Sequence, residues 1–382
     1  MSKFLKIMIV LLTIVAVAAP VMAEDRLGLS GQMRVRGWHI DDGGDTTESW
    51  ADQRLRIGGK FSIAEGVSVT FRTDVTEANW GANAGFGSGR LPASNANQWD
   101  RAHLDIASGN LHLRAGQQYL AFGNSGFDAQ DNGLTLNYKG AIPVTAFWMI
   151  NDDGGGESST DSYYYGIKAG HKGESYASSI YLAGQTDVSD AGENVMVIGV
   201  TLDYNLDAVA LYGEVDFFMG DATEDTDAAG TNLMLQASMA ATETINVGGQ
   251  FFFSPGEDED VKYDILGNDF GGWDPLFAIG TGLDNEQIGT GRPWGIFGDA
   301  GVMAFRVFGD VKASDDLTVS GSLAFLQSED DDIADDDAMA LAVGCSYSVM
   351  ANTSLGVQIE YIDVDSLDDE ILQAGTGLFV NF

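Results

Sequence analysis

The sequence predicts a single transmembrane antiparallel β-barrel of about 18 strands, with 16 strands as the fallback. Three observations support this fold class. Apolar residues recur with a period of two along most of the chain, the connections between these segments are short and long in turn, and the two ends carry an export signal and an alternating strand. No apolar run after residue 23 approaches the roughly 20 residues of a membrane helix, which excludes a helical membrane protein.

The amino end has the pattern of a secretory signal peptide over residues 1–23. Lys3 and Lys6 form a short basic region, residues 7–19 are apolar, and Val21-Met22-Ala23 provides a cleavage site. We therefore expect export and one mature barrel domain over residues 24–382. The alternative is an uncleaved membrane anchor, but the apolar core is short for a hydrocarbon layer roughly 30 Å thick.

The amino-acid composition limits the classes of partner. Removing Lys3 and Lys6 with the signal leaves 17 basic residues against 57 acidic ones, a net charge of −40, which argues against nucleic acid as a partner. Cys345 is the only cysteine, so neither an intrachain disulfide nor a thiolate metal site can form. Acidic bursts such as Asp330-Asp331-Asp332 favour solvated loops over cation sites. We expect no cofactor and no resident metal.

Segments of about ten residues alternate between apolar and polar faces. In the first segment Leu29, Met33 and Val35 share one face, while Arg34 and Arg36 lie on the other. The same alternation recurs over residues 54–63, 67–75, 104–106, 111–113, 134–138, 198–202, 233–237, 303–307, 317–325, 341–347 and 355–361. Helical spacing does not explain these runs.

The connections alternate in length. The tight ones are 64–66, 107–109, 139–143, 171–174, 205–207, 242–244, 313–316 and 350–352, and the longer ones include 41–49, 81–97, 151–161, 219–230 and 254–298. Short turns at one end and long loops at the other are typical of outer-membrane barrels, whose short turns face the periplasm. A soluble β-sandwich also alternates faces, but a chain of this length would usually be divided by a linker, and none is present.

The last segment of the chain alternates up to its final residue. Leu378, Val380 and Phe382 share one face, which predicts a closing strand with an aromatic end. Together with the signal peptide and the alternating connections, this strand resembles the Gram-negative bacterial outer-membrane porins over the whole mature chain. The resemblance implies an outer-membrane location, a homotrimer and contact with lipid and lipopolysaccharide.

Arginines are concentrated on the polar face of the first five predicted strands. We define the arginine ladder as these seven of the eleven arginines of the mature chain: Arg34, Arg36, Arg54, Arg56, Arg72, Arg101 and Arg114. Because charge is costly on a lipid-facing surface, they should line the lumen, where fixed charge filters solutes. The alternative is that they are paired wall residues, since a turn at 64–66 sets Arg56 opposite Asp74.

The resemblance also implies that a loop narrows the pore. In porins the third loop folds inward and presents acids to wall arginines, which here points to residues 118–130 with Asp128 and Asp131. The longest connection, 254–298, contains Trp273, Arg292 and Trp294. It is equally a candidate for the constriction or for an external cap or subunit contact.

We expect passive diffusion of small hydrophilic solutes or ions through a water-filled channel. A substrate-specific channel is the alternative, and a barrel enzyme or an adhesin is less favoured. His103 and His112 should face the lumen near Asp105, but no nucleophile motif and no third metal ligand accompanies them, so we expect no enzyme. Divalent cations at the acidic loops are a further expected partner.

Overall fold

The computed structural model describes residues 26–41, 47–80, 98–152, 161–187, 193–223, 225–257, 260–267, 279–283, 300–330, 336–366 and 370–382. The predicted signal peptide, residues 1–23, lies outside these ranges, as do Trp273, Arg292 and Trp294. In the described part of the chain, no helix is both long and apolar enough to span a bilayer.

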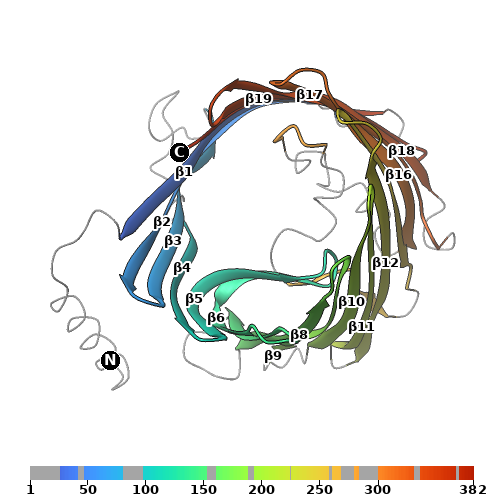
Figure 1. Ribbon diagram of the computed structural model, residues 1–382. Helices are drawn as coiled ribbons and strands as arrows, with labels where there is room; N and C mark the ends of the chain where they lie inside the picture. Colours follow the sequence, from blue (N-terminus) through green and yellow to red (C-terminus); the bar gives the residue numbers. More distant parts are fainter. Residues whose placement is uncertain are drawn as a thin grey trace.

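Eighteen long antiparallel strands form a closed barrel (Figure 1). They are β1 (Leu27–Asp41), β2 (Thr47–Ala64), β3 (Val67–Asn79), β4 (Gln98–Ser108), β5 (Leu111–Phe122), β6 (Phe127–Tyr138), β7 (Val144–Asp152), β8 (Ser162–Lys172), β9 (Tyr176–Asp187), β10 (Asn194–Leu206), β11 (Val209–Thr223), β12 (Thr226–Ala240), β13 (Ile245–Pro255), β16 (Gly301–Lys312), β17 (Leu317–Gln327), β18 (Asp337–Met350), β19 (Thr353–Val364) and β20 (Ile371–Asn381). Two short strands, β14 (Val261–Lys262) and β15 (Leu266–Gly267), belong to the connection between β13 and β16. The predicted count of 18 is confirmed, and the fallback of 16 is wrong.

The barrel closes where β1 pairs with β20 in an antiparallel register from Gln32↔Asn381 to Asp41↔Leu372. The final residue continues this pairing, because Phe382 and Gly31 exchange backbone hydrogen bonds of 2.7 and 3.0 Å. A Cβ at Gly31 would lie 2.4 Å from the Phe382 ring and 2.9 Å from the backbone oxygen of Arg56, so a larger residue here would have to displace both. Leu378 and Phe382 are exposed on the outer face, whereas Phe379 faces inward and is 7% exposed.

Alternation along each strand separates an apolar outer face from a mostly polar inner face. On β16, Phe305 is 54% exposed on the outside, while its neighbour Arg306 is 2% exposed on the inside. This closure leaves no unpaired edge toward lipid, which is the condition for a sheet to cross a membrane.

The eight predicted tight turns lie at the end of the barrel that carries both termini. They follow β2, β4, β6, β8, β10, β12, β16 and β18, as predicted. Two predicted long connections are wrong. Residues 219–223 belong to β11 and 226–230 to β12, while residues 118–122 belong to β5 and 127–130 to β6, so both pairs of strands extend further than predicted.

Candidate functional site: the lumen and its constriction

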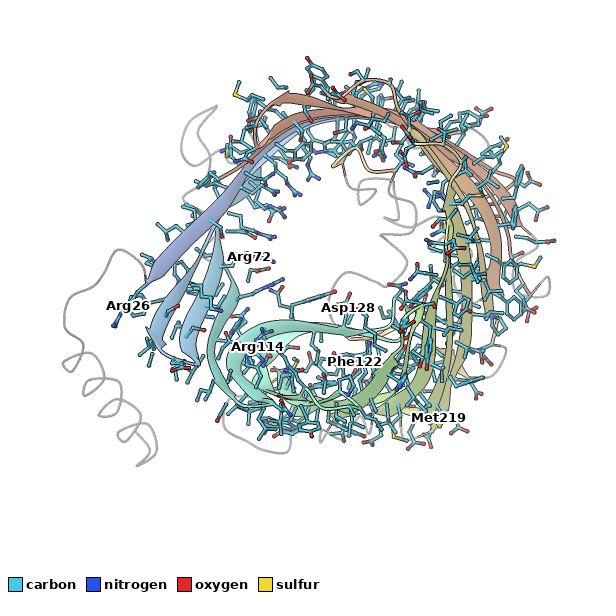
Figure 2. The ribbon with its side chains drawn as sticks, viewed as in Figure 1. Arg26, Arg72, Arg114, Phe122, Asp128 and Met219 are labelled. Carbon is cyan, nitrogen blue, oxygen red and sulfur yellow. The ribbon has the colours of Figure 1, made fainter. Side chains whose placement is uncertain are left out.

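The residues of the arginine ladder project from β1 to β5 on the inner side of the wall. Figure 2 shows Arg72 and Arg114 pointing into the lumen, while Arg26 lies outside the ring. Arg34 and Arg36 are 6% and 4% exposed, so their guanidinium groups lie against the wall. All seven predicted positions therefore lie in one adjoining sector, formed by five consecutive strands.

Two β-bulges place additional carboxylates in this sector. Between β2 and β3 the register skips Val75, so that Glu77 reaches the lumen and its carboxylate lies 2.8 Å from Arg34 Nη2. Between β3 and β4 the register skips Asp100, which lies beside Arg101 and is 5% exposed. A bulge turns a side chain to the other face. Strict alternation therefore could not predict that Glu77 and Asp100 line the lumen.

The arginines pair with carboxylates of the wall. Arg36 Nε lies 2.9 Å from Asp52 Oδ1, and Trp38 Nε1 donates to the same carboxylate at 3.0 Å. Arg56 donates to both oxygens of Asp74 at 2.6 and 2.8 Å. The alternative interpretation of paired wall residues is therefore correct for the Arg56–Asp74 pair that illustrated it.

Pairing does not cancel the charge of the ladder. Glu77 contacts both Arg34 and Arg54, and Asp100 contacts Arg56, Arg72 and Arg101. Among the described residues, the seven arginines contact five carboxylates, which are Asp52, Asp74, Glu77, Asp100 and Asp105. Within the described part of the chain, the arginines of this sector therefore outnumber the carboxylates that they contact by two.

A second polar cluster lies near the tight turns. Asp105 Oδ1 is 2.9 Å from His112 Nε2 and 3.1 Å from Arg114 Nε, and Asp105 Oδ2 is 2.9 Å from His103 Nδ1. The predicted proximity of the two histidines to Asp105 is confirmed. Among the described residues, no group of three or more histidine, cysteine or acidic side chains is arranged to hold a metal ion.

The hairpin of β5 and β6 leaves the wall and folds into the lumen. β5 pairs with β4 as far as Gln117, and β6 pairs with β7 from Asn132 onward, while the two strands stay paired with each other out to Phe122 and Phe127. Gly116, with a φ of 123°, faces Gly133 at the bend. Figure 1 shows the far ends of β5 and β6 inside the ring of the other strands.

The tip of this hairpin binds two carboxylates of β11. The backbone N–H of Asn124 donates to both oxygens of Glu214 at 2.8 Å, and Ser125 Oγ donates to Asp216 Oδ2 at 2.7 Å. The hydroxyl of Tyr181 donates to Asp216. Glu214 and Asp216 are 2% and 0% exposed, so hairpin and wall form a closed polar contact.

Beneath the hairpin lies an apolar core inside the barrel. Phe122 and Phe127 are 1% and 0% exposed, and their ring centroids lie 5.3 and 4.7 Å from that of Phe147 on β7. Met149, Tyr164, Tyr181, Val195, Val197 and Phe218 complete the buried cluster from β7 to β11. The hairpin therefore covers this part of the inner wall.

The two predicted constriction acids lie on the inward-folded part of β6. Asp128 is 8% exposed and stands opposite Gly267 of β15, which pairs with β6 in parallel register. Asp131 stands opposite Gln118 of β5. On β5 the ring centroid of Tyr119 lies 6.0 Å from the guanidinium carbon of Arg101, so the hairpin borders the arginine ladder.

The longest connection also enters the lumen in its described parts. β15 lies on the hairpin, and residues 279–283 lie on the opposite wall, where Thr281 Oγ1 donates to Gln358 at 2.5 Å. Leu283 packs with Trp38 and Phe379. Figure 1 shows this short orange segment within the ring. Of the two predicted roles, the described residues fit an inward-folded connection.

Comparison with known proteins agrees with this architecture. The family model described as Gram-negative porin matches residues 10–368. The chain belongs to the Gram-negative porin family. This porin is an outer-membrane channel through which solutes diffuse, and its family and fold indicate a channel rather than an enzyme. No curated protein sequence matches it significantly.

Solved structures share the fold of this porin. Acinetobacter baumannii OccAB4 is 12% identical with a TM-score of 0.61, and the match covers 94% of this chain and 99% of that chain. Pseudomonas aeruginosa OccK9 (OpdG) is 13% identical with a TM-score of 0.64, covering 95% and 100%. A BenF-like porin from Pseudomonas fluorescens Pf-5 is 12% identical with a TM-score of 0.62, covering 95% and 100%.

Sequence reasoning missed the residues that hold the hairpin of this porin. Glu214 and Asp216 are acidic residues on a polar face, where nothing distinguishes them from ordinary lumen residues. A signal for the apolar core was present, because Phe147 and Trp148 stand side by side in β7 and both faces of this strand are apolar. A strand that is apolar on both faces is buried on both.

Proposed function

We propose that this porin is a passive diffusion channel for small hydrophilic solutes and ions, with a preference for those that carry negative charge. The observation that supports the proposal is that, among the described residues, the seven arginines of the ladder outnumber their five carboxylate partners, in a sector of the wall outside the buried cluster beneath the hairpin. Fixed charge in a narrow, water-filled path concentrates counter-ions and excludes ions of like charge.

The acidic surface of the protein opposes this preference only weakly. The mature chain would carry many more acids than bases, but seven of its eleven arginines belong to the ladder. Exposed charges more than a Debye length away, about 8 Å in physiological salt, are largely screened. The charge nearest the constriction should therefore determine selectivity.

The test is the reversal potential of the purified porin in a planar bilayer under a tenfold KCl gradient. The reversal potential of the wild-type channel should have the sign expected for anion selectivity, with a magnitude below the limit of about 59 mV for a tenfold gradient. Arg54→Glu combined with Arg56→Glu changes the local charge by four units, so the excess of two positive charges becomes two negative ones. The sign of the reversal potential should invert.

A matched control makes the same change of charge at residues outside the arginine ladder. Lys139→Glu with Lys172→Glu makes the same charge change at the turn-bearing end, outside the ladder. It should leave the sign unchanged. An unchanged reversal potential in the Arg54 and Arg56 variant, in a channel that still conducts, would show that the ladder is not at the constriction.

Three further properties belong to the proposal. Cleavage after Ala23 should give a mature chain beginning at Glu24, which intact mass measures. The porin resemblance supports a homotrimer, which light scattering in detergent tests. The exposed acids Asp337, Asp363 and Asp365, near the loop-bearing end of β18 and β19, support bridging by divalent cations to lipopolysaccharide phosphates. Loss of bound lipopolysaccharide on chelation would be the expected result.

A further inference from the structure

A separate cavity lies in the lumen at the turn-bearing end of the arginine ladder. Its volume is about 350 Å³, and its lining includes Ala64, Gly66 and Ala107 of the tight turns after β2 and β4. Short turns face the periplasm in barrels of this class. The cavity therefore lies at the periplasmic mouth, where a solute leaves the channel.

The lining of this cavity is rich in basic side chains. Besides backbone and small residues, it includes Lys60, Arg101, His103, Asp105, His112 and Arg114. Lysine and arginine keep their charge at neutral pH. Three permanent positive charges and two imidazoles therefore surround a single carboxylate.

That carboxylate is fully engaged with its neighbours. Asp105 accepts a hydrogen bond from Thr70 Oγ1 at 3.2 Å, and it also contacts His103, His112 and Arg114 at 2.9, 2.9 and 3.1 Å. Asp105 accepts hydrogen bonds from Thr70, His112 and Arg114, so it orients the His112 imidazole and Arg114, and it offsets one positive charge. The lining therefore has two more cations than carboxylates, and Arg101 also lies 3.5 Å from Asp100 outside the lining.

The cations that remain are open to solvent. The side chains of Arg101 and Arg114 are 37% and 32% exposed, and Lys60 is exposed on the adjoining strand. Arg36, in contrast, has only 4% of its side chain exposed, beside Asp52. Solutes can therefore reach these cations directly, while the arginines near the other end are largely occupied by the wall.

We propose that this cavity binds small dianions of the phosphate class, such as inorganic phosphate and simple phosphate esters. The ligand's two charges match the two in excess, and guanidinium groups present paired N–H donors that suit phosphate oxygens. The volume equals that of roughly ten waters, enough for a phosphate with part of its hydration shell. The proposal rests on the proposed function, because it supplies a ligand class for the same path.

The experiment measures block of chloride current by inorganic phosphate added to one side of a single channel at a time. Because the cavity lies at one mouth, block should be several-fold stronger from one side than from the other. Lys60→Gln should weaken the stronger block roughly 3- to 10-fold and reduce the difference between sides, since one cation near the ligand is lost. Asp105→Asn, which removes the opposing carboxylate, should strengthen it by a similar factor.

Lys172→Gln is the matched control, because it removes a lysine at the same end of the barrel, on β8, outside the cavity lining. It should leave both block and sidedness unchanged. Equal block from both sides, with no effect of Lys60→Gln, would overturn the proposal while leaving the channel function intact.

If the purified protein carries no current, the proposed function is refuted, but phosphate binding to the cavity can still be tested. Equilibrium dialysis of radiolabelled phosphate against the detergent-solubilised barrel measures binding without current. Saturable binding that Lys60→Gln weakens and Asp105→Asn strengthens supports the site. Binding that neither substitution alters overturns it.

Discussion

Replacing Glu214 by glutamine tests whether the folded hairpin sets the width of the channel. The carboxylate of Glu214 accepts the backbone N–H groups of Asn124 and Ser125 at 2.8 and 3.0 Å, and the hydroxyl of Tyr212 donates to it as well. Glutamine keeps one acceptor oxygen and presents an N–H₂ group to donors. Hydrogen bonds to charged groups contribute about 1.5–3 kcal/mol, and an unsatisfied buried donor costs about 1–3 kcal/mol.

These magnitudes predict a weakened contact, not a released hairpin. A loss of about 2–4 kcal/mol shifts the equilibrium between seated and unseated hairpin roughly 30- to 900-fold. The apolar contacts oppose release, because burial of Phe122 and Phe127 contributes about 1.5–3 kcal/mol each. Adding Phe127→Ala, which should cost about 3–5 kcal/mol of packing energy, should weaken the apolar contact enough to free the hairpin.

Single-channel recording separates the two outcomes. Glu214→Gln should increase open-channel noise with little change in mean conductance, and the variant that also carries Phe127→Ala should conduct more. Glu360→Gln is the control, since Glu360 is a lumen carboxylate with 4% exposure that bonds to Gln358 on its own strand. Wild-type conductance and noise in the folded double variant would refute the conclusion that the hairpin restricts the path.

Two other substitutions test the closure of the barrel between β1 and β20 and the charge of the arginine ladder. Gly31→Val should lower the fraction of folded protein in heat-modifiable electrophoresis, because its Cβ would lie 2.4 Å from the Phe382 ring. Gly28→Val is the control and should fold normally, because a Cβ there has nothing within 4 Å. Equal folding of the two variants would contradict the role given to the contact between Gly31 and Phe382. Asp100→Asn should move the reversal potential further toward anion selectivity, since it removes the carboxylate that Arg56, Arg72 and Arg101 share. A shift of the reversal potential toward cation selectivity would contradict this prediction.

Much of the wall could be predicted because its rules are local. The eight tight turns, the strand count of 18 and the outward face of Leu378 and Phe382 all follow from a period of two interrupted by turns. The two wrong connections have different causes. Residues 219–230 are mostly polar or small, and polar ends of long strands have the same composition as loops, whereas 118–130 was assigned to a loop from the porin resemblance although it contains Phe122 and Phe127.

The lumen depended on contacts between distant residues. Ser125 meets Asp216 across 91 positions of sequence, and Thr281 meets Gln358 across 77, so no window of sequence shows either contact. The skipped residues Val75 and Asp100 are likewise defined by the register of the partner strand. The predicted pairing of Asp128 and Asp131 with the arginine ladder stays a prediction.

By itself, the sequence determined that this chain forms a closed barrel and that seven arginines share one sector of its inner wall. Both follow from alternation along single strands, which is set by neighbouring residues. Only the tertiary structure determined which part of the inner wall the hairpin covers and which carboxylates pair with the arginines. These depend on the folded hairpin at Glu214 and on the bulges that add Glu77 and Asp100, because packing and register are properties of segments brought together by the fold.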